Sequence, residues 1–137
     1  MAFEGSVEDR LAIHELVAAY ADAVTRNDGD AWGALWAEDS VWELAAIPGM
    51  EHIVGRDAIL KAWHAAMDSL PPMVATSTLG AVRITGDTAT GHAYPREFIY
   101  WPDGKTRTDT GRYDDTYVKQ DGRWLFKSRA YTSLHSA

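Results

Sequence analysis

The sequence predicts a single α+β domain in which three helices cover one face of a curved, mostly antiparallel sheet. Two observations carry this prediction. Apolar residues recur at helical spacing up to Pro71-Pro72, and from Met73 onward apolar and polar residues alternate with the period of two that is typical of strands. The length of 137 residues suits one domain spanning residues 1–137.

The first helix has a recognisable start. Ser6 with Asp9 three residues later resembles a capping box. Ile13, Leu16 and Tyr20 then follow at helical spacing, up to a turn at residues 27–30. The remaining elements of this half are expected as a short helix over 32–36, a strand at 41–44, a loop at 47–50 and a third helix from 55 to 67.

Glycine-containing turns divide the second half into long strands. The turns are expected at Gly86-Asp87, Pro102-Asp103-Gly104 and Gln120-Asp121-Gly122. They separate a strand containing Val82 and Ile84, two long strands at about 88–101 and 107–119, and a last strand that begins near 124.

Composition excludes several classes of function. The formal net charge of −7 argues against nucleic acid and anionic membranes as partners. No apolar run approaches the roughly 20 residues that span a bilayer, and residues 1–9 lack the pattern of a secretory signal. The absence of cysteine excludes disulfides and thiolate nucleophiles and fits a cytoplasmic protein. No nucleotide-binding motif or metal-ligand spacing occurs, so neither a cofactor nor a metal is expected.

The ordered motifs resemble the SnoaL-like family of the nuclear-transport-factor-2-like superfamily. The resemblance covers about residues 7–131 and implies a cone-shaped fold with a pocket between helices and sheet. The superfamily includes ketosteroid isomerases, scytalone dehydratase, hexachlorocyclohexane dehydrochlorinase, polyketide cyclases, epoxide hydrolases and non-catalytic binders. The matching segments are 12–13 with 20–24, 35–39, 55–59, 86–91, 111–115 and 121–124.

Two positions that are catalytic in dehydratase-like members hold inert residues here. Those members pair an Asp late in the first helix with a His at the start of the long strands. The corresponding positions are Thr25 and Ala75, and neither side chain can take a proton from carbon. Asp22 is not a substitute, since it lies about 200° around the helix from Tyr20 and is expected to pair with Arg26 in solvent.

Resemblance to ketosteroid isomerases suggests a different set of catalytic residues. Tyr20 and Asp114 match the two residues that form an oxyanion hole in that family. The catalytic base of that family falls at Leu44, and strand alternation turns the adjacent Glu43 to the other face.

Alignment of the long strands with those of the family places several of their polar residues on the face that lines the pocket. This interpretation makes His92 a general acid or base, with Asp114 and Tyr20 as the other catalytic residues. The alternative is a structural ion pair between an arginine and an aspartate on neighbouring strands. Pro95 favours a bulge in its strand, and a bulge would turn these polar residues away from the pocket. The expected substrate-binding residues are Trp42, Leu44, Trp63, Met73, Tyr94, Arg96, Phe98 and Arg112.

Three functions remain open at this point. The first, implied by the resemblance, is proton transfer (isomerisation, dehydration or cyclisation) on an apolar cyclic molecule of polyketide, terpenoid or steroid type. The second is a non-catalytic ligand-binding or assembly module, which the inert Thr25 and Ala75 favour. The third is an epoxide hydrolase, whose carboxylate–Arg–carboxylate set lacks a second carboxylate beside Asp114. The resemblance also implies a homodimer through the outer sheet face, with Tyr113, Tyr117 and Trp124 contributing.

Overall fold

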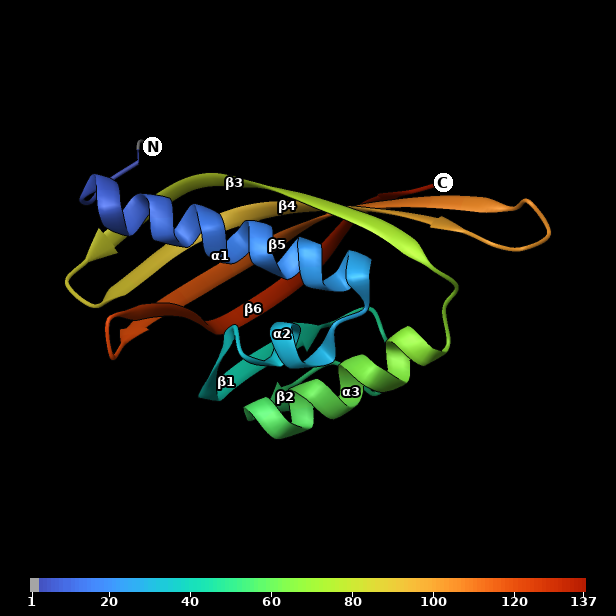
Figure 1. Ribbon diagram of the computed structural model, residues 1–137, viewed down its shortest axis with the longest axis horizontal. Helices are drawn as coiled ribbons and strands as arrows, with labels where there is room; N and C mark the ends of the chain where they lie inside the picture. The colour runs from blue at the N-terminus through green and yellow to red at the C-terminus, as the bar shows by residue number, and fades with distance from the viewer. Residues whose placement is uncertain (1–2) are drawn as a thin grey trace.

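The computed structural model describes residues 3–137 and confirms the α+β class (Figure 1). One sheet has the strand order β2-β1-β6-β5-β4-β3, and all neighbouring strands are antiparallel except β1 and β6. The elements are α1 (Val7–Arg26), α2 (Gly29–Gly33), β1 (Trp36–Leu44), β2 (Ile53–Val54), α3 (Arg56–Asp68), β3 (Met73–Thr85), β4 (Thr88–Tyr100), β5 (Thr106–Gln120) and β6 (Arg123–Ser136).

Helix α1 begins and ends as the sequence predicts. The Asp9 amide donates to Ser6 Oγ at 3.1 Å, so Ser6 caps the first turn. Asn27 ends the helix in a left-handed conformation with φ of 52°, which asparagine tolerates. The buried stripe of α1 includes Ile13 and Val17, and the helix packs along β3. No helix within residues 3–137 is long and apolar enough to cross a membrane.

The region after α1 differs from the prediction. Asp28 caps α2 by accepting the Ala31 amide at 3.0 Å, and the helix ends by Gly33. Trp36 then starts β1 and pairs in parallel with Phe126 of β6, although its spacing from Trp32 suggests a helix. Pairing with β6 outweighs the helical spacing because it buries the whole indole ring of Trp36. Strand β2 was not predicted, since two residues are too short to show a period.

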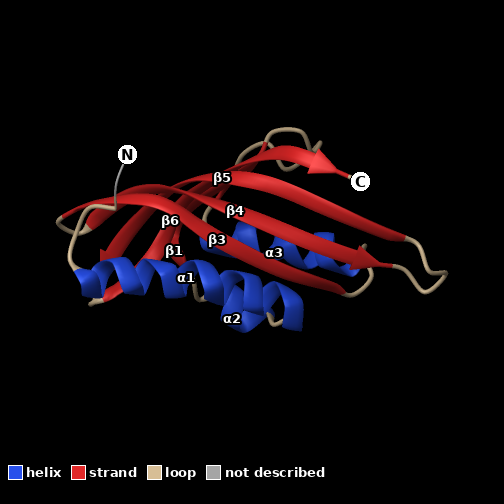
Figure 2. Cartoon of the chain, turned by 90° about the horizontal axis from the view of Figure 1, so that it is seen from above, coloured by secondary structure: helices blue, strands red, loops and turns tan. Residues whose placement is uncertain are grey.

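The helices gather on one side of the sheet (Figure 2). On that side β4 presents Ala89, Ala93 and Ile99, and β5 presents Tyr113 and Tyr117, all of them buried. These side chains meet an aromatic cluster in which Trp32, Trp36, Trp42, Trp63, Tyr20 and Phe126 pack with ring centroids 4.8–6.2 Å apart. The inner sheet face and the helices therefore enclose the core, and a cavity lies within it.

Candidate functional site

A cavity of about 190 Å³ lies between the sheet, α1 and α3. Most of its lining is apolar or aromatic, and its polar groups are few, which is the usual make-up of a small-molecule site. The lining residues are Tyr20, Ala21, Val24, Trp42, Leu44, Ile47, Met50, Trp63, Ala66, Met67, Leu70, Met73, Ala75, Thr76, Ser77, Pro95, Glu97, Ile99, Arg107, Asp109, Tyr113 and Tyr131.

Two phenol groups in this lining form a hydrogen-bonded pair. The hydroxyls of Tyr20 and Tyr113 are 3.3 Å apart, and Trp42 Nε1 donates to the Tyr113 hydroxyl at 3.0 Å. One phenol must donate to the other, and the indole donates rather than accepts. Within the described part of the chain, one of the two hydroxyl hydrogens therefore stays free to bind an oxygen of a ligand.

A buried cation lies against the same phenol rings. The Arg129 guanidinium carbon is 4.4 Å from the centroid of the Tyr20 ring and 3.8 Å from that of Tyr113. Burial raises the pKa of Tyr20 to about 12, although the charge of Arg129 opposes the shift. Burial also raises the pKa of Tyr113 well above its usual value. Both phenols thus remain protonated at neutral pH and act as hydrogen-bond donors, not as bases.

Arg129 has one buried counter-ion. Its Nε and one terminal nitrogen donate to the two oxygens of Asp115 at 2.7 and 3.0 Å, and the Tyr117 hydroxyl donates to the same carboxylate at 2.8 Å. The side chains of Arg129 and Asp115 are 1% and 0% exposed. A two-pronged contact of this kind holds the guanidinium in one orientation under the phenol rings.

Glu97 is one of the titratable groups of the cavity that the sequence interpretation missed. It is half-buried on β4, opposite Ala75 of β3 and opposite Asp109 of β5. Arg107 Nε pairs with Asp109 at 3.1 Å. Within residues 3–137 no hydrogen bond acts on the Glu97 carboxyl; burial raises its pKa, the charge of Asp109 adds to the rise, and Arg107 opposes it.

The raised pKa of Glu97 predicts a pH dependence of stability. Between the ordinary value near 4.5 and the higher folded value, the folded protein holds a proton that the unfolded chain has released. The contribution of Glu97 to the free energy of unfolding therefore falls as the pH rises through this window. We expect Glu97→Gln, which cannot ionise, to remove this fall in urea titrations at several pH values. An unchanged pH profile in the variant would show that Glu97 titrates normally.

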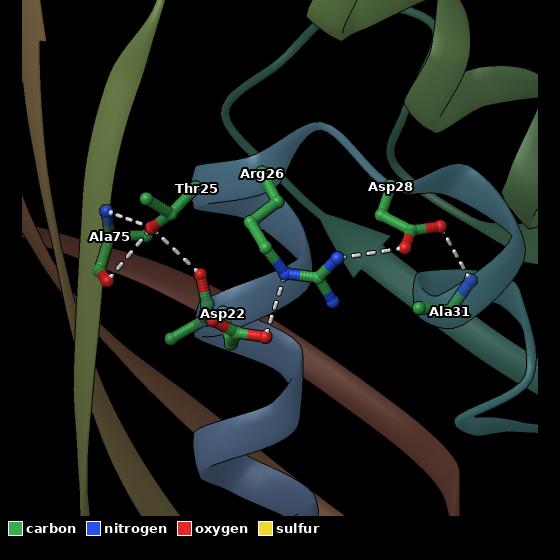
Figure 3. A network of polar contacts seen from close by, with 7 residues as sticks. Asp22, Thr25, Arg26, Asp28, Ala31 and Ala75 are labelled. Carbon is green, nitrogen blue, oxygen red and sulfur yellow. Dashed lines mark hydrogen bonds and ion pairs between the residues drawn. The ribbon is translucent and has the colours of Figure 1, made fainter.

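Thr25 and Ala75, which replace the acid–base pair of the family, are in direct contact. The Ala75 amide donates to Thr25 Oγ1 at 2.9 Å, and the hydroxyl lies 3.0 Å from Ala21 O and 3.2 Å from Ala75 O (Figure 3). Thr25 thus joins α1 to β3 by hydrogen bonds and has no acid–base function. Asp22 faces solvent and pairs with Arg26 at 3.0 Å, as the sequence predicts.

Removal of the Thr25 hydroxyl is expected to cost about 1 kcal/mol of stability, the usual net value of such hydrogen bonds. Thr25→Val keeps the shape of the side chain but leaves the Ala75 amide without its acceptor. The free energy of unfolding from urea titration measures the loss. Thr78→Val, on the exposed face of β3, is the control, and an equal effect there would remove any special role of the α1–β3 link.

The face assigned to the long strands was wrong. His92, Tyr94, Arg96 and Phe98 lie on the outer face of β4, and Arg112 and Asp114 lie on the outer face of β5. The β4–β5 register continues unchanged past Pro95, so alternation places Ala93, Pro95, Glu97 and Ile99 inside. Since side chains alternate with period two, a register error of one residue exchanges the two faces completely.

On the outer face the polar residues pair with one another, but the contact between the strands joins a histidine to an aspartate, whereas the alternative interpretation expected an Arg–Asp bridge there. His92 Nδ1 lies 2.8 Å from Asp114 Oδ1, and Arg112 Nε lies 3.5 Å from the same oxygen. The residues proposed for an outer dimer surface were also misplaced. Tyr113, Tyr117 and Trp124 are only 4%, 1% and 6% exposed, so none of them is available on the outer face.

Five predicted site residues do line the cavity: Tyr20, Trp42, Leu44, Trp63 and Met73. Glu43, next to Leu44, pairs with His52 at 2.9 Å and lies outside the cavity lining. A signal for Glu97 was present in the sequence. It is the one charged residue in the alternating set Ala89, Gly91, Ala93, Pro95, Glu97 and Ile99, the small and apolar face of that strand.

The family follows from comparison of the whole chain. The model of the SnoaL-like domain matches residues 5–130. The chain belongs to the SnoaL-like family. A search among curated proteins finds no match.

Solved structures share the fold of this SnoaL-like protein. A candidate aromatic ring hydroxylase from Novosphingobium aromaticivorans is 28% identical, with a TM-score of 0.84 and coverage of 96% of this chain and 93% of that chain. A candidate scytalone dehydratase from the same species is 20% identical, with a TM-score of 0.84 and coverage of 96% and 87%. Hexachlorocyclohexane dehydrochlorinase type 3 from Novosphingobium barchaimii is 16% identical, with a TM-score of 0.80 and coverage of 96% and 90%. Identities this low establish the NTF2-like fold and leave the reaction to be argued from the site.

Proposed function

We propose that this SnoaL-like protein is a cofactor-independent enzyme that moves a proton between positions of a small apolar molecule. Glu97 is the acid–base group, and the Tyr20–Tyr113 pair binds the oxygen on which charge develops. The observation that carries the proposal is a carboxyl group that faces an apolar cavity, has a raised pKa, and has no hydrogen-bond partner within residues 3–137.

The expected reaction begins at a carbon next to a carbonyl group. The Glu97 carboxylate takes the proton from this carbon, and the C–H electron pair moves into the carbonyl to form an enolate. The free phenol hydrogen of the Tyr20–Tyr113 pair binds the enolate oxygen, and the charge of Arg129 behind the rings stabilises it. Where a carbon–carbon double bond adjoins the enolate, Glu97 then returns the proton to the far carbon of that double bond, the enolate electrons re-form the carbonyl, and the double bond shifts by one position. The raised pKa makes Glu97 a stronger base than a solvent-exposed glutamate.

The position of Glu97 supports this role despite the inert Thr25 and Ala75. Ala75 stands where dehydratase-like members of the family carry histidine, and Glu97 lies directly opposite it on the neighbouring strand. Both residues line the same cavity. An acid–base group on β4 therefore reaches the space that a histidine on β3 reaches in those members.

Hydrogen exchange in D₂O tests the proposal with simple ketones in place of the natural substrate. Cyclic ketones and enones are incubated with the protein, and deuterium on carbon is measured by NMR and mass spectrometry. We expect exchange of the protons next to the carbonyl, faster with wild type than with Glu97→Gln. If ligands bind but neither protein exchanges them, the chain is a binding module and the proposal fails.

Epoxide hydration is a second candidate, and two carboxylates beside an arginine in the cavity lining support it. Glu97, Arg107 and Asp109 line the cavity together, and Arg107 is bound to Asp109. In this reaction one carboxylate takes a proton from water, the water oxygen bonds to an epoxide carbon as the bond from that carbon to the epoxide oxygen breaks, and the other carboxyl, in its protonated form, gives its proton to that oxygen. Cyclic epoxides in ¹⁸O-labelled water distinguish the two candidates, since only hydration places the label in a diol.

A further inference from the structure

We infer that the ligand of this cavity is a neutral molecule built on a single ring, and not a steroid or another fused-ring compound. The inference rests on the proposed function in taking this cavity as the active site. Three features of the structure carry it: the volume of the cavity, the rigidity of its walls and the charges that line it.

The volume suits one ring. A dry protein cavity of roughly 150 Å³ accepts benzene. The present cavity measures about 190 Å³ and is therefore only moderately larger. It has space for a six-membered ring with a short substituent, and a second ring fused to that molecule would take up the space that remains.

The two largest wall residues cannot move aside easily. Trp63 stacks on Trp32 with centroids 4.8 Å apart and planes 15° from parallel, and both rings are buried. The Trp42 indole is held by its hydrogen bond to the Tyr113 hydroxyl. Behind Tyr20 and Tyr113, Arg129 fills the space up to Phe126. Enlargement at this end of the cavity thus requires breaking the aromatic cluster or the buried ion pair.

Adjustment is easier at the loop between β1 and β2. Ile47 and Met50 of this loop line the cavity, and Ile47 is 42% exposed. The Leu44 amide donates to Met50 O at 2.9 Å and both oxygens of Glu51 accept the Gly49 amide, so the loop has a defined conformation. This loop is therefore the part of the wall that a larger ligand would displace at the lowest cost.

The charges favour a neutral ligand. The charged residues in the lining are Glu97, Asp109 and Arg107, and Arg107 already pairs with Asp109. Within residues 3–137 the cation of this lining is already paired, and a carboxylate or phosphate group would also meet the carboxyl of Glu97. A carbonyl or ether oxygen needs only a donor, and the Tyr20–Tyr113 pair supplies one.

A ligand series on ¹⁵N-labelled protein tests size and charge separately. Acetophenone is the neutral one-ring probe, benzoate has the same size and a negative charge, 2-acetylnaphthalene adds a ring, and a steroid ketone has four rings. We expect acetophenone to shift the indole N–H signals of Trp42 and Trp63, and the other three to bind at least about tenfold more weakly. Equal or tighter binding of the two-ring or four-ring ketone overturns the size limit, and equal binding of benzoate overturns the charge limit.

A variant that enlarges the cavity provides the second test. Met67 lines the cavity and is only half-buried, so Met67→Ala is expected to fold and to strengthen binding of 2-acetylnaphthalene about tenfold. Val74→Ala, on the exposed face of β3, is the control and should change nothing. Failure of Met67→Ala to change the preference contradicts the size limit. Acetophenone binding without proton exchange would leave this inference intact and defeat the proposed function, whereas exchange in a fused-ring ketone would do the reverse.

Discussion

Replacement of Asp115 by asparagine is expected to lower the free energy of unfolding by about 3–5 kcal/mol, the usual cost of breaking a buried ion pair. Asparagine has nearly the same shape as aspartate but no charge, so Arg129 would stay buried without its counter-ion. The Tyr117 hydroxyl would also lose its charged acceptor. Urea titration measures the effect as a lower midpoint with little change in slope.

The adjacent residue supplies a matched control. Asp114→Asn makes the same change one position earlier, on the outer face, where the Asp114 side chain is 46% exposed. Exposed ion pairs contribute little, so this variant should stay within about 1 kcal/mol of wild type. Equal losses in the two variants would contradict the assignment of faces on β5. A small loss in Asp115→Asn would mean that the rings of Tyr20, Tyr113 and Phe126 stabilise the guanidinium without a counter-ion.

Replacement of Glu97 by glutamine is expected to reduce kcat by a factor of about 10²–10⁴, the usual contribution of a general acid or base. Glutamine preserves the size of the side chain and the cavity but cannot accept a proton. The affinity for acetophenone should change much less than the rate, because the amide still occupies the same place in the lining. The readout is the rate of deuterium exchange in a ketone that the wild-type protein turns over.

The control for this variant is Glu43→Gln, which makes the same change outside the cavity lining, on a residue that pairs with His52. It should retain the wild-type rate. Retention of the rate in Glu97→Gln, combined with its loss in His92→Ala, would return the catalytic role to the outer face and contradict the proposed site.

Local sequence signals predicted the parts of the fold that depend on neighbouring residues in the chain. The Ser6 cap and the Asn27 end of α1 follow from hydrogen bonds within a few residues. The turns at Gly86, Gly104 and Gly122 need backbone angles with positive φ, which glycine adopts readily, and all three glycines have positive φ. Trp36 was misassigned because its strand conformation depends on Phe126, which is distant along the chain.

Composition, spacing and motif order were enough to predict the fold class and the order of the long elements. The resemblance to the family implied that its usual acid–base pair is replaced at Thr25 and Ala75. The sequence also indicated five residues of the cavity, which are Tyr20, Trp42, Leu44, Trp63 and Met73. All of these features can be recognised along the chain without knowledge of which strands pack against which helices.

The face of β4 and β5 that lines the cavity depends on tertiary packing. Both faces of β4 alternate acceptably, one with His92 and the other with Glu97, and the periodicity of one strand does not distinguish them. The inner face must accommodate α1 and the aromatic cluster, and small and apolar side chains fit there. Because of this packing, Glu97 lies in the cavity lining together with Asp109. The same packing buries the ion pair of Arg129 and Asp115 against the two phenol rings. Residues from β4, β5, β6 and α1 meet in this arrangement, so the residue types along one strand can indicate Glu97 but not the groups that surround it.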